Sequence, residues 1–139
     1  MAANKFLGHY KLESSDNLEE FMKTLGVNIV LRKIGMSSYP DLTMEHIEGD
    51  HYKINEWTMI KSHIWDFTLG QEFKDKTVDG RNVLSTIRIE GDKLVQIEKP
   101  ASGKGKIPSY TWELKDNNDL HITYELEGVV CNREYKRLK

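Results

Sequence analysis

The chain closes on GVVCNREYKRLK, residues 128–139, whose alternating pattern is typical of a β-strand. Because side chains of a strand alternate between its two faces, Val129, Cys131, Arg133 and Tyr135 share one side. The opposite row is wetter: Val130, Asn132, Glu134 and Lys136. A buried arginine destabilises a fold unless it is paired and hydrogen-bonded. We therefore expect an anionic group to meet Arg133; the alternative is that Arg133 lies at a frayed strand end and reaches water.

Similar alternating runs fill the chain upstream of this strand, from about residue 40. Gly, Asp and Asn clusters separate the runs, as in hairpins, and they lie at 48–50, 69–72, 78–82, 90–92, 116–119 and 126–128. The stretch 98–110 contains enough Pro, Gly and Ser for a longer connection between two strands. The sequence therefore predicts an antiparallel meander.

Only the region before the meander has helical periodicity. A first strand, FLGHYKLES, precedes SDNLEEFMKTLG, where we expect Asp16 to cap a helix that Gly26 ends. The apolar positions of this helix follow helical spacing: Leu18, Phe21, Met22 and Leu25. A second short helix is predicted to end at Gly35 and to have an apolar side made of Val30, Leu31 and Ile34.

The predicted order is one strand, two short helices and about nine further hairpin-linked strands. So many antiparallel strands must close or stack, because an open sheet leaves unpaired edges. A barrel with the helical pair across one mouth satisfies this requirement. Barrels of this size enclose a ligand cavity. We therefore place the function in the interior.

Composition limits the class of protein. The chain suits a single domain, 1–139, and 20 Lys+Arg against 22 Asp+Glu give a net charge of −2, which argues against a nucleic-acid partner. Cys131 is the only cysteine, so no intramolecular disulfide forms. The opening MAANKFLGHY lacks the apolar run of a signal peptide, and we expect a cytosolic protein. The sequence contains no run of about 18 consecutive apolar residues, so no membrane span is predicted.

Catalytic and metal-binding patterns are missing from the sequence. There is no GxSxG or HExxH motif, and Cys131 lies on the dry row of its strand, where a thiol is usually inert. We expect no catalytic residue, no metal and no cofactor. The inward rows instead combine apolar surface with hydroxyl, indole and guanidinium donors: Tyr110, Trp112, Ile122, Tyr124, Arg133 and Tyr135. This mixture suits a pocket for an amphipathic ligand, although an aromatic core with satisfied polar tips remains the alternative.

Three segments carry a resemblance to a known family: FLGHYKLESSDNLEEFMKTLGV at 6–27, FTLGQEFKDKTVDGRNVLS at 67–85 and VVCNREYKRL at 129–138. The chain resembles the intracellular lipid-binding proteins, the fatty-acid-binding family that also includes retinoid and bile-acid carriers. This resemblance implies an all-β fold, a ten-stranded antiparallel up-and-down clamshell β-barrel with a helix-turn-helix lid between the first two strands. It also implies a non-catalytic carrier that holds a ligand carboxylate on an Arg-x-Tyr pair, here Arg133 and Tyr135.

The chain departs from the family pattern at three positions. Trp112 stands where members that bind fatty acids or retinoic acid commonly place a second arginine, so we expect its indole beside the head group. Leu18 replaces the usual aromatic residue after Asn17, and Ile60 stands where many relatives have phenylalanine at the entrance. An aromatic gate is therefore not expected.

The expected function is reversible carriage of a long-chain fatty acid or a similar hydrophobic carboxylate. Each buried methylene contributes about 0.8 kcal/mol, so the acyl chain supplies most of the affinity and Arg133 selects the head group. The residues expected at the apolar wall and portal are Leu18, Phe21, Met22, Val27, Ile60, Tyr110, Ile122 and Tyr124. Two alternatives stay open: a carrier of neutral, retinol-like or sterol-like lipids, and a membrane-apposing structural protein.

Three basic residues of the helical region suggest a membrane contact. Lys23, Arg32 and Lys33 lie on or beside the polar sides of the two helices. We expect a monomer whose helices dock transiently on anionic membranes, where each basic residue contributes about 1 kcal/mol. An ordinary solvated helix face is the alternative. Whether the protein also reaches the nucleus stays open.

Overall fold

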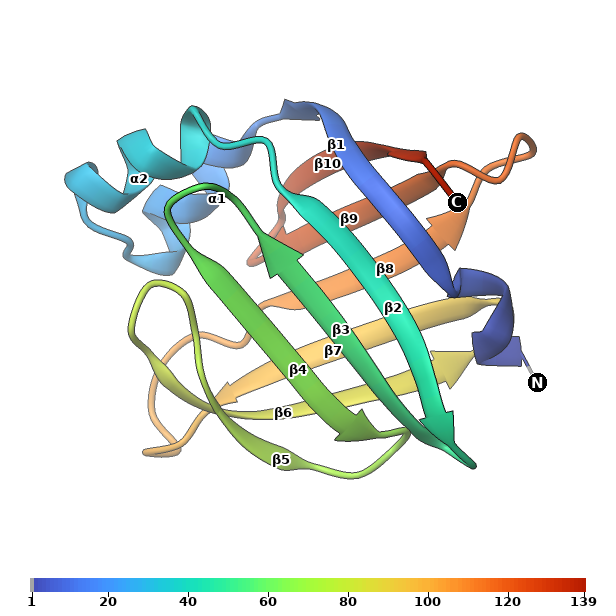
Figure 1. Cartoon of the computed structure of the whole chain (residues 1–139). Coiled ribbons are helices and arrows are strands. Elements are labelled where there is room, and N and C mark those ends of the chain that lie inside the picture. The colour runs from blue at the N-terminus through green and yellow to red at the C-terminus, as the bar shows by residue number, and fades with distance from the viewer. Residues whose placement is uncertain (1) are drawn as a thin grey trace.

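Ten antiparallel strands form one sheet that curls into a nearly closed barrel in the computed structural model, which describes residues 2–139 (Figure 1). The strands are β1 (Gly8–Asp16), β2 (Asp41–Glu48), β3 (His51–Trp57), β4 (Ser62–Thr68), β5 (Phe73–Lys76), β6 (Asn82–Glu90), β7 (Lys93–Pro100), β8 (Ser109–Leu114), β9 (Leu120–Leu126) and β10 (Val129–Arg137). Their order in the sheet is β4-β3-β2-β1-β10-β9-β8-β7-β6-β5. The predicted ten-stranded up-and-down barrel is confirmed.

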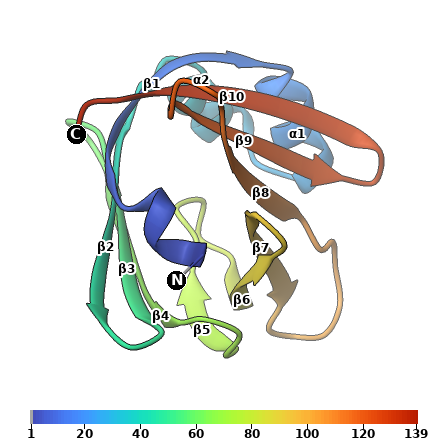
Figure 2. The same ribbon diagram turned by 90° about the vertical axis from the view of Figure 1, so that its right-hand side faces the viewer.

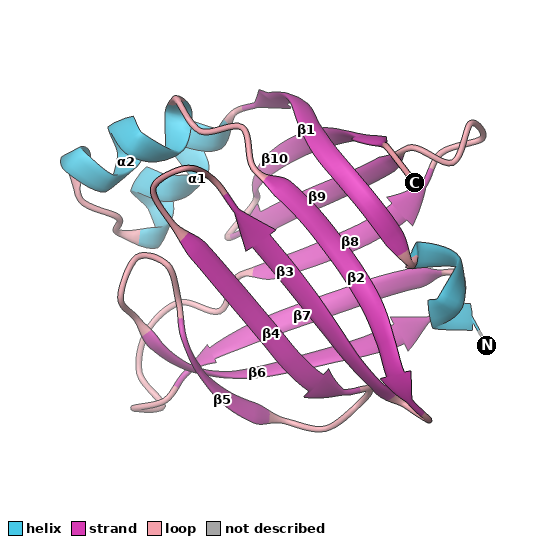
Figure 3. Cartoon of the chain, viewed as in Figure 1, coloured by secondary structure: helices cyan, strands magenta, loops and turns pink. Residues whose placement is uncertain are grey.

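Two short helices, α1 (Leu18–Leu25) and α2 (Ile29–Met36), lie between β1 and β2. They cover one end of the barrel (Figure 3). A 3₁₀ helix, η1 (Ala2–Phe6), lies at the end away from α1 and α2. Phe6 is fully buried, and the Tyr10 hydroxyl donates to its carbonyl oxygen at 2.8 Å. The first strand therefore begins at Gly8, later than predicted, because residues 2–6 coil inward to pack against the core.

The sheet is interrupted at one place, between β4 and β5. These strands are the two ends of the strand order, and no backbone hydrogen bond joins them in the part of the chain that the structure describes. Figure 2 shows the two strands leaving the turn between them. Two side-chain contacts cross the interruption: His63 Nε2 to Asp75 Oδ2 at 2.9 Å, and Lys61 Nζ to the Val78 carbonyl at 3.3 Å.

The first helix begins differently from the prediction that Asp16 caps it. Asp16 belongs to β1, and its carboxylate accepts from the Asn132 backbone N–H of β10 at 2.8 Å. The N-cap is Asn17, in the left-handed region at φ 57°, whose side chain donates to the Val130 carbonyl at 2.9 Å. The helix entrance is therefore attached to β10. Gly26 ends the helix at φ 94°, as predicted.

The second helix corrects two expectations. Val30 is 64% exposed and lies outside the apolar side, whereas Leu31 and Ile34 face the barrel interior. Gly35 does not end the helix, which continues to Met36. A Cβ at Gly35 would lie 3.0 Å from the Met22 sulfur, so the glycine allows α2 to pack closely on α1.

Burial along the strands follows the predicted alternation. In β10, Cys131, Arg133 and Tyr135 are buried while the opposite row is half-buried or exposed. The main core cluster lies inside the barrel and includes Phe6, Tyr10, Tyr52, Phe67, Trp112 and Tyr135. A smaller cluster fastens α1 to the last hairpin: Leu18, Phe21, Leu126 and Cys131. Burial of these apolar groups holds the helices over the barrel mouth.

Candidate functional site

An interior cavity of about 260 Å³ lies below the helices. Both helices and the inward faces of strands from both sides of the barrel contribute to its lining, together with the β3–β4 and β5–β6 turns. The turn residues that line the cavity are Thr58, Lys61, Thr77, Val78 and Asp79. The cavity therefore extends as far as α2 and these two turns, and we call this region the portal.

The strand register aligns the cavity wall into rows. Trp112 of β8 lies opposite Ile122 of β9, which lies opposite Arg133 of β10. One row nearer the helices, Tyr110 lies opposite Tyr124. These pairings explain why residues spread over 24 positions of sequence meet on one wall, because hairpins bring every second residue to the same face.

Arg133 is 6% exposed, and it lines the cavity. Across residues 2–139 its guanidinium makes no hydrogen bond or salt bridge with the protein, and its Nε atom is fully buried without a partner. Its closest favourable contact is a cation–π arrangement, with the guanidinium carbon 5.3 Å from the ring centroid of Tyr124. The positive charge therefore faces the cavity with its hydrogen-bonding capacity unused.

Tyr135 lies two residues further along β10, between Leu12 of β1 and Leu120 of β9. Its side chain is buried next to the cavity without belonging to the lining, and its hydroxyl makes no hydrogen bond with the described residues. Burial, followed by the neighbouring Tyr124, raises the pKa of Tyr135 well above its ordinary value, although Arg133 opposes the shift. The phenol therefore keeps its proton and remains a donor.

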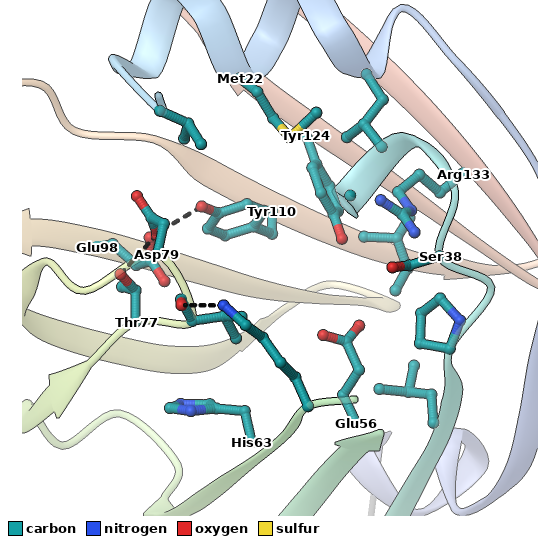
Figure 4. Close-up of a pocket in the computed structure, with 18 of the residues that line it drawn as sticks. Met22, Ser38, Glu56, His63, Thr77, Asp79, Glu98, Tyr110, Tyr124 and Arg133 are labelled. Atoms are coloured by element: carbon teal, nitrogen blue, oxygen red, sulfur yellow. Dashed lines mark hydrogen bonds between the residues drawn. The ribbon is translucent and has the colours of Figure 1, made fainter. Parts of the chain in front are cut away.

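Glu56 of β3 faces the same cavity, and the sequence analysis missed it (Figure 4). Burial raises the pKa of its carboxyl above the usual value, while the charges of Arg133 and His63 act in the opposite direction. Glu56 continues the inward row of Tyr52 and Ile54, so the alternation argument applied to β10 would also have found it.

A second polar group surrounds Arg81, which lies just before β6 at the end of the β5–β6 turn. Its Nε donates to Asp79 Oδ2 at 2.8 Å, and one terminal nitrogen donates to Asp79 Oδ1 at 3.2 Å and to Glu98 Oε1 at 3.3 Å. The same Glu98 oxygen accepts from the Tyr110 hydroxyl at 2.9 Å. We call Asp79, Arg81, Glu98 and Tyr110 the Arg81 cluster. Its charged groups satisfy one another inside the protein.

The carboxyl groups of the Arg81 cluster differ in their pKa values. Burial alone would raise the pKa of Asp79, but hydrogen bonds from Arg81 and Thr77 outweigh it and lower the pKa below the usual value. For Glu98, which is 5% exposed, burial prevails over Arg81 and Tyr110, and the pKa is raised. Sequence reasoning missed this cluster because Asp79 and Arg81 belong to a segment that reads as a polar turn.

Most residues expected at the wall do line the cavity. From the helical segment these are Leu18, Phe21, Met22 and Val27, and from the strands Tyr110, Trp112, Ile122 and Tyr124. Ile60 differs, because it is 75% exposed on the β3–β4 turn and lies outside the cavity lining. It stands at the rim beside Lys61. Trp112 packs edge-on against Phe6, with ring centroids 6.1 Å apart.

The three basic residues of the helices have different surroundings. Lys23 and Lys33 are exposed. Arg32 is mostly buried, and it donates to the Val27 carbonyl at 2.7 Å and approaches Glu19 at 4.0 Å. Arg32 therefore holds the turn between the helices, and the two lysines carry the exposed charge.

Two further features concern the described part of the chain, residues 2–139. None of its helices combines the length and the apolar character required to cross a bilayer. The same residues contain no group of three or more His, Cys, Asp or Glu side chains arranged to hold a metal ion.

Known proteins are similar to this chain in sequence and in architecture. Residues 7–138 match the model of the lipocalin / cytosolic fatty-acid binding protein family. Cellular retinoic acid-binding protein 2 of Homo sapiens is 38% identical and aligns over 95% of this chain and 97% of its own. Fatty acid-binding protein homolog 6 of Caenorhabditis elegans is 36% identical, over 97% and 98%.

A solved structure agrees in fold over the whole length. The fatty acid binding protein of Schistosoma mansoni, in complex with arachidonic acid, superposes with a TM-score of 0.90 at 30% identity and 100% coverage of both chains. The helical pair after the first strand, the ten-stranded barrel and the internal cavity agree with these matches. The chain therefore belongs to the lipocalin / cytosolic fatty-acid binding protein family and is a lipid-binding carrier, not an enzyme.

Proposed function

We propose that this carrier binds a long-chain fatty acid or a similar hydrophobic carboxylate inside the barrel, with the carboxylate at Arg133 and Tyr135. One observation carries the proposal: a buried guanidinium that faces the cavity and has no hydrogen bond or salt bridge to the described residues. A buried cation of this kind is costly until an anion meets it, and a carboxylate accepts two parallel bonds from arginine. The buried Tyr135 hydroxyl is a second donor near this site.

The walls of the cavity suit the rest of such a molecule. Leu18, Phe21, Met22, Val27 and Ile54 present apolar surface, against which a hydrocarbon chain gains about 0.8 kcal/mol per methylene. The names of these two relatives, which mention retinoic acid and fatty acid, agree with a carboxylate ligand, whereas retinol-binding protein 1 of Bos taurus, 33% identical, is named for a neutral one, and the choice is part of the test.

Trp112 supports one alternative, a carrier of neutral lipids. Its indole lies in the same cross-strand row as Arg133, with Ile122 between them, and it adds no second positive charge beside the ligand head group. Glu56 adds a carboxyl group to the same cavity. In this alternative a ligand hydroxyl, rather than a carboxylate, would contact Arg133.

Matched pairs of ligands distinguish the two candidates. Oleic acid and oleyl alcohol, and retinoic acid and retinol, are titrated against delipidated protein by displacement of a fluorescent acyl probe. We expect the acid of at least one pair to bind tenfold or more tightly than its alcohol, since a charge-assisted bond contributes about 1.5–3 kcal/mol. Arg133→Met should abolish that preference. Equal binding of acid and alcohol to the natural protein would overturn the carboxylate proposal.

We also propose that the portal touches anionic membranes when ligand is exchanged. Lys23 and Lys33 are exposed on the helices. Large apolar side chains are exposed on α2 and on the two turns at the portal: Ile29, Val30, Met59, Ile60 and Val78. Basic charge beside exposed apolar groups is the composition that binds an anionic lipid surface.

Transfer of a fluorescent fatty acid to vesicles tests this contact. The double variant Lys23→Glu, Lys33→Glu should transfer more slowly to anionic vesicles and at an unchanged rate to neutral ones. Lys74→Glu, an exposed change on β5, is the matched control and should transfer normally. Equal rates for all three proteins would refute the membrane contact. Clustering of vesicles by the natural protein would instead favour the membrane-apposing structural role.

A further inference from the structure

A second set of polar groups faces the cavity, away from Arg133. Gln96 and Glu98 lie two positions apart on β7, so their side chains point to the same face of the sheet. Both line the cavity, and Gln96 lies opposite Tyr110 of β8. In Figure 4, Glu98 and Arg133 lie on opposite sides of the view, with Tyr110 and Tyr124 between them. The cavity therefore has polar groups at two separate places.

Gln96 brings an unused donor to this second place. Its side chain is 9% exposed, and its amide nitrogen is fully buried without a hydrogen-bond partner among residues 2–139. Most buried polar groups in proteins are paired, so a buried amide nitrogen without a partner on a cavity wall indicates a group meant for a ligand. A plain hydrocarbon chain in this position would leave the donor unsatisfied.

Glu98 brings an acceptor next to it. The hydrogen bonds that Glu98 makes with the described side chains, from Arg81 and from Tyr110, all reach Oε1. The second oxygen, Oε2, keeps its accepting capacity. Because Glu98 is held by two partners, it presents this oxygen in a defined direction.

A donor from Gln96 and an acceptor from Glu98 match the chemistry of a hydroxyl group, which can accept one hydrogen bond and donate another. A carbonyl group could use only the amide donor of Gln96, and an ammonium group would leave that donor without a partner. A second carboxylate on the ligand would lie beside the carboxyl group of Glu98 in a buried site, which is unfavourable for two acidic groups. The pair therefore selects a hydroxyl among the common polar groups of lipids.

We propose that Gln96 and Glu98 form a second recognition site for a hydroxyl group on the ligand chain, so that the preferred ligands are hydroxylated lipid acids. The inference rests on the proposed function, because it assumes that the acid head group occupies the corner of Arg133. It adds a specificity that the Arg-x-Tyr pair alone does not supply. The affinity should depend on where along the chain the hydroxyl lies, since both polar places are fixed in the barrel.

The test compares stearic acid with a positional series of hydroxystearic acids on delipidated protein, by displacement of a fluorescent acyl probe. We expect at least one positional isomer to bind about tenfold more tightly than stearic acid, the value of one or two well-placed hydrogen bonds. Gln96→Met, a change of similar size, should reduce that preference to twofold or less, because it removes the donor that only the hydroxylated ligand can use. Thr111→Val on β8, outside the cavity lining, is the control and should keep the preference.

The outcomes separate this inference from the proposed function. If stearic acid binds and Arg133→Met weakens it, but no hydroxylated isomer gains affinity, the second site is refuted and the carboxylate proposal stands. If the preference for one isomer persists in Gln96→Met, the hydroxyl is recognised elsewhere and the inference is also overturned. If neither stearic acid nor any isomer binds, the proposed function itself fails.

Discussion

Arg81 and Arg133 both line the cavity, yet their surroundings differ. Arg81 donates to Asp79 and Glu98, so its charge is met by the protein itself. Arg133 is more deeply buried and has neither a hydrogen bond nor a salt bridge to any described residue. Burial therefore does not distinguish a structural arginine from a binding arginine. What distinguishes them is whether the protein already supplies the anion.

The largest expected effect is the loss of the satisfied arginine. Arg81→Met should lower the free energy of unfolding by about 2 kcal/mol at neutral pH, because it leaves Asp79 and Glu98 without their cation; we take less than the value for a fully buried pair, since Arg81 is 28% exposed. Urea unfolding measures the change. Arg88→Met, which breaks an exposed pair with Glu90, is the control and should cost about 0.5 kcal/mol or less.

The unsatisfied arginine should give the opposite sign. Arg133→Met is expected to raise the free energy of unfolding of the ligand-free protein by about 1 kcal/mol, because it removes a buried charge that makes no hydrogen bond or salt bridge to the described residues. The same variant should lose most of the thermal stabilisation that oleate gives to the natural protein. If Arg133→Met destabilised the ligand-free protein as much as Arg81→Met does, the proposed difference between the two arginines would be refuted.

Asp79, which is bonded to Arg81, and Glu56, which shares the cavity with Arg133, should respond to pH in opposite ways. The pKa of Asp79 is lowered in the folded protein, so its contribution to stability is present above its ordinary value of 3.8 and is lost as the pH falls through the folded pKa. The pKa of Glu56 is raised, so stability falls as the pH rises from its ordinary value of 4.5 through the folded pKa.

Unfolding free energies measured from pH 3 to 8 would reveal these signs. Asp79→Asn should be less stable than the natural protein at pH 7, and the difference should shrink in acid. Glu56→Gln should be more stable at pH 7, and its advantage should disappear below about pH 4.5. Parallel curves for Glu56→Gln and the natural protein would mean that Glu56 is not held in the cavity as a costly charge.

The smallest expected effect concerns the contact across the interruption of the sheet. His63→Ala removes the bond to Asp75, and we expect a loss of about 0.5 kcal/mol in stability together with faster amide exchange in β4 and β5. Hydrogen exchange followed by mass spectrometry reports both strands. His51→Ala is the control, since His51 pairs with Asp66 across strands that backbone bonds already join.

The sequence predicted the fold well because hairpin turns and alternation are local signals. The order of strand, helical pair and meander, and the inward positions of Tyr110, Trp112 and Arg133, follow from residues a few positions apart. Errors arose where tertiary contacts replace local ones. The Asp16 carboxylate accepts a hydrogen bond from Asn132 of β10, more than 100 residues away, instead of capping α1. Gly35 allows α1 and α2 to approach closely instead of ending α2.

The candidate site was predictable only in part, for a related reason. Arg133 stood out because it breaks an apolar row of one strand. Glu56 breaks the inward row of Tyr52 and Ile54 on β3 in the same way, so the same local signal indicates it. Arg81 and Glu98 could not be paired from sequence, because their contact joins the β5–β6 turn to β7 and depends on how the barrel closes.

The interruption between β4 and β5 has a consequence for self-association. Unpaired strand edges are templates on which other chains add strands and aggregate. Here the two free edges belong to the same barrel and are bridged by the side chains of His63 and Asp75, while β5 is four residues long with Lys74 and Lys76 exposed. These features leave little room for an incoming strand of another molecule. The sheet can therefore stay open between β4 and β5 without providing an edge to which another molecule could add a strand.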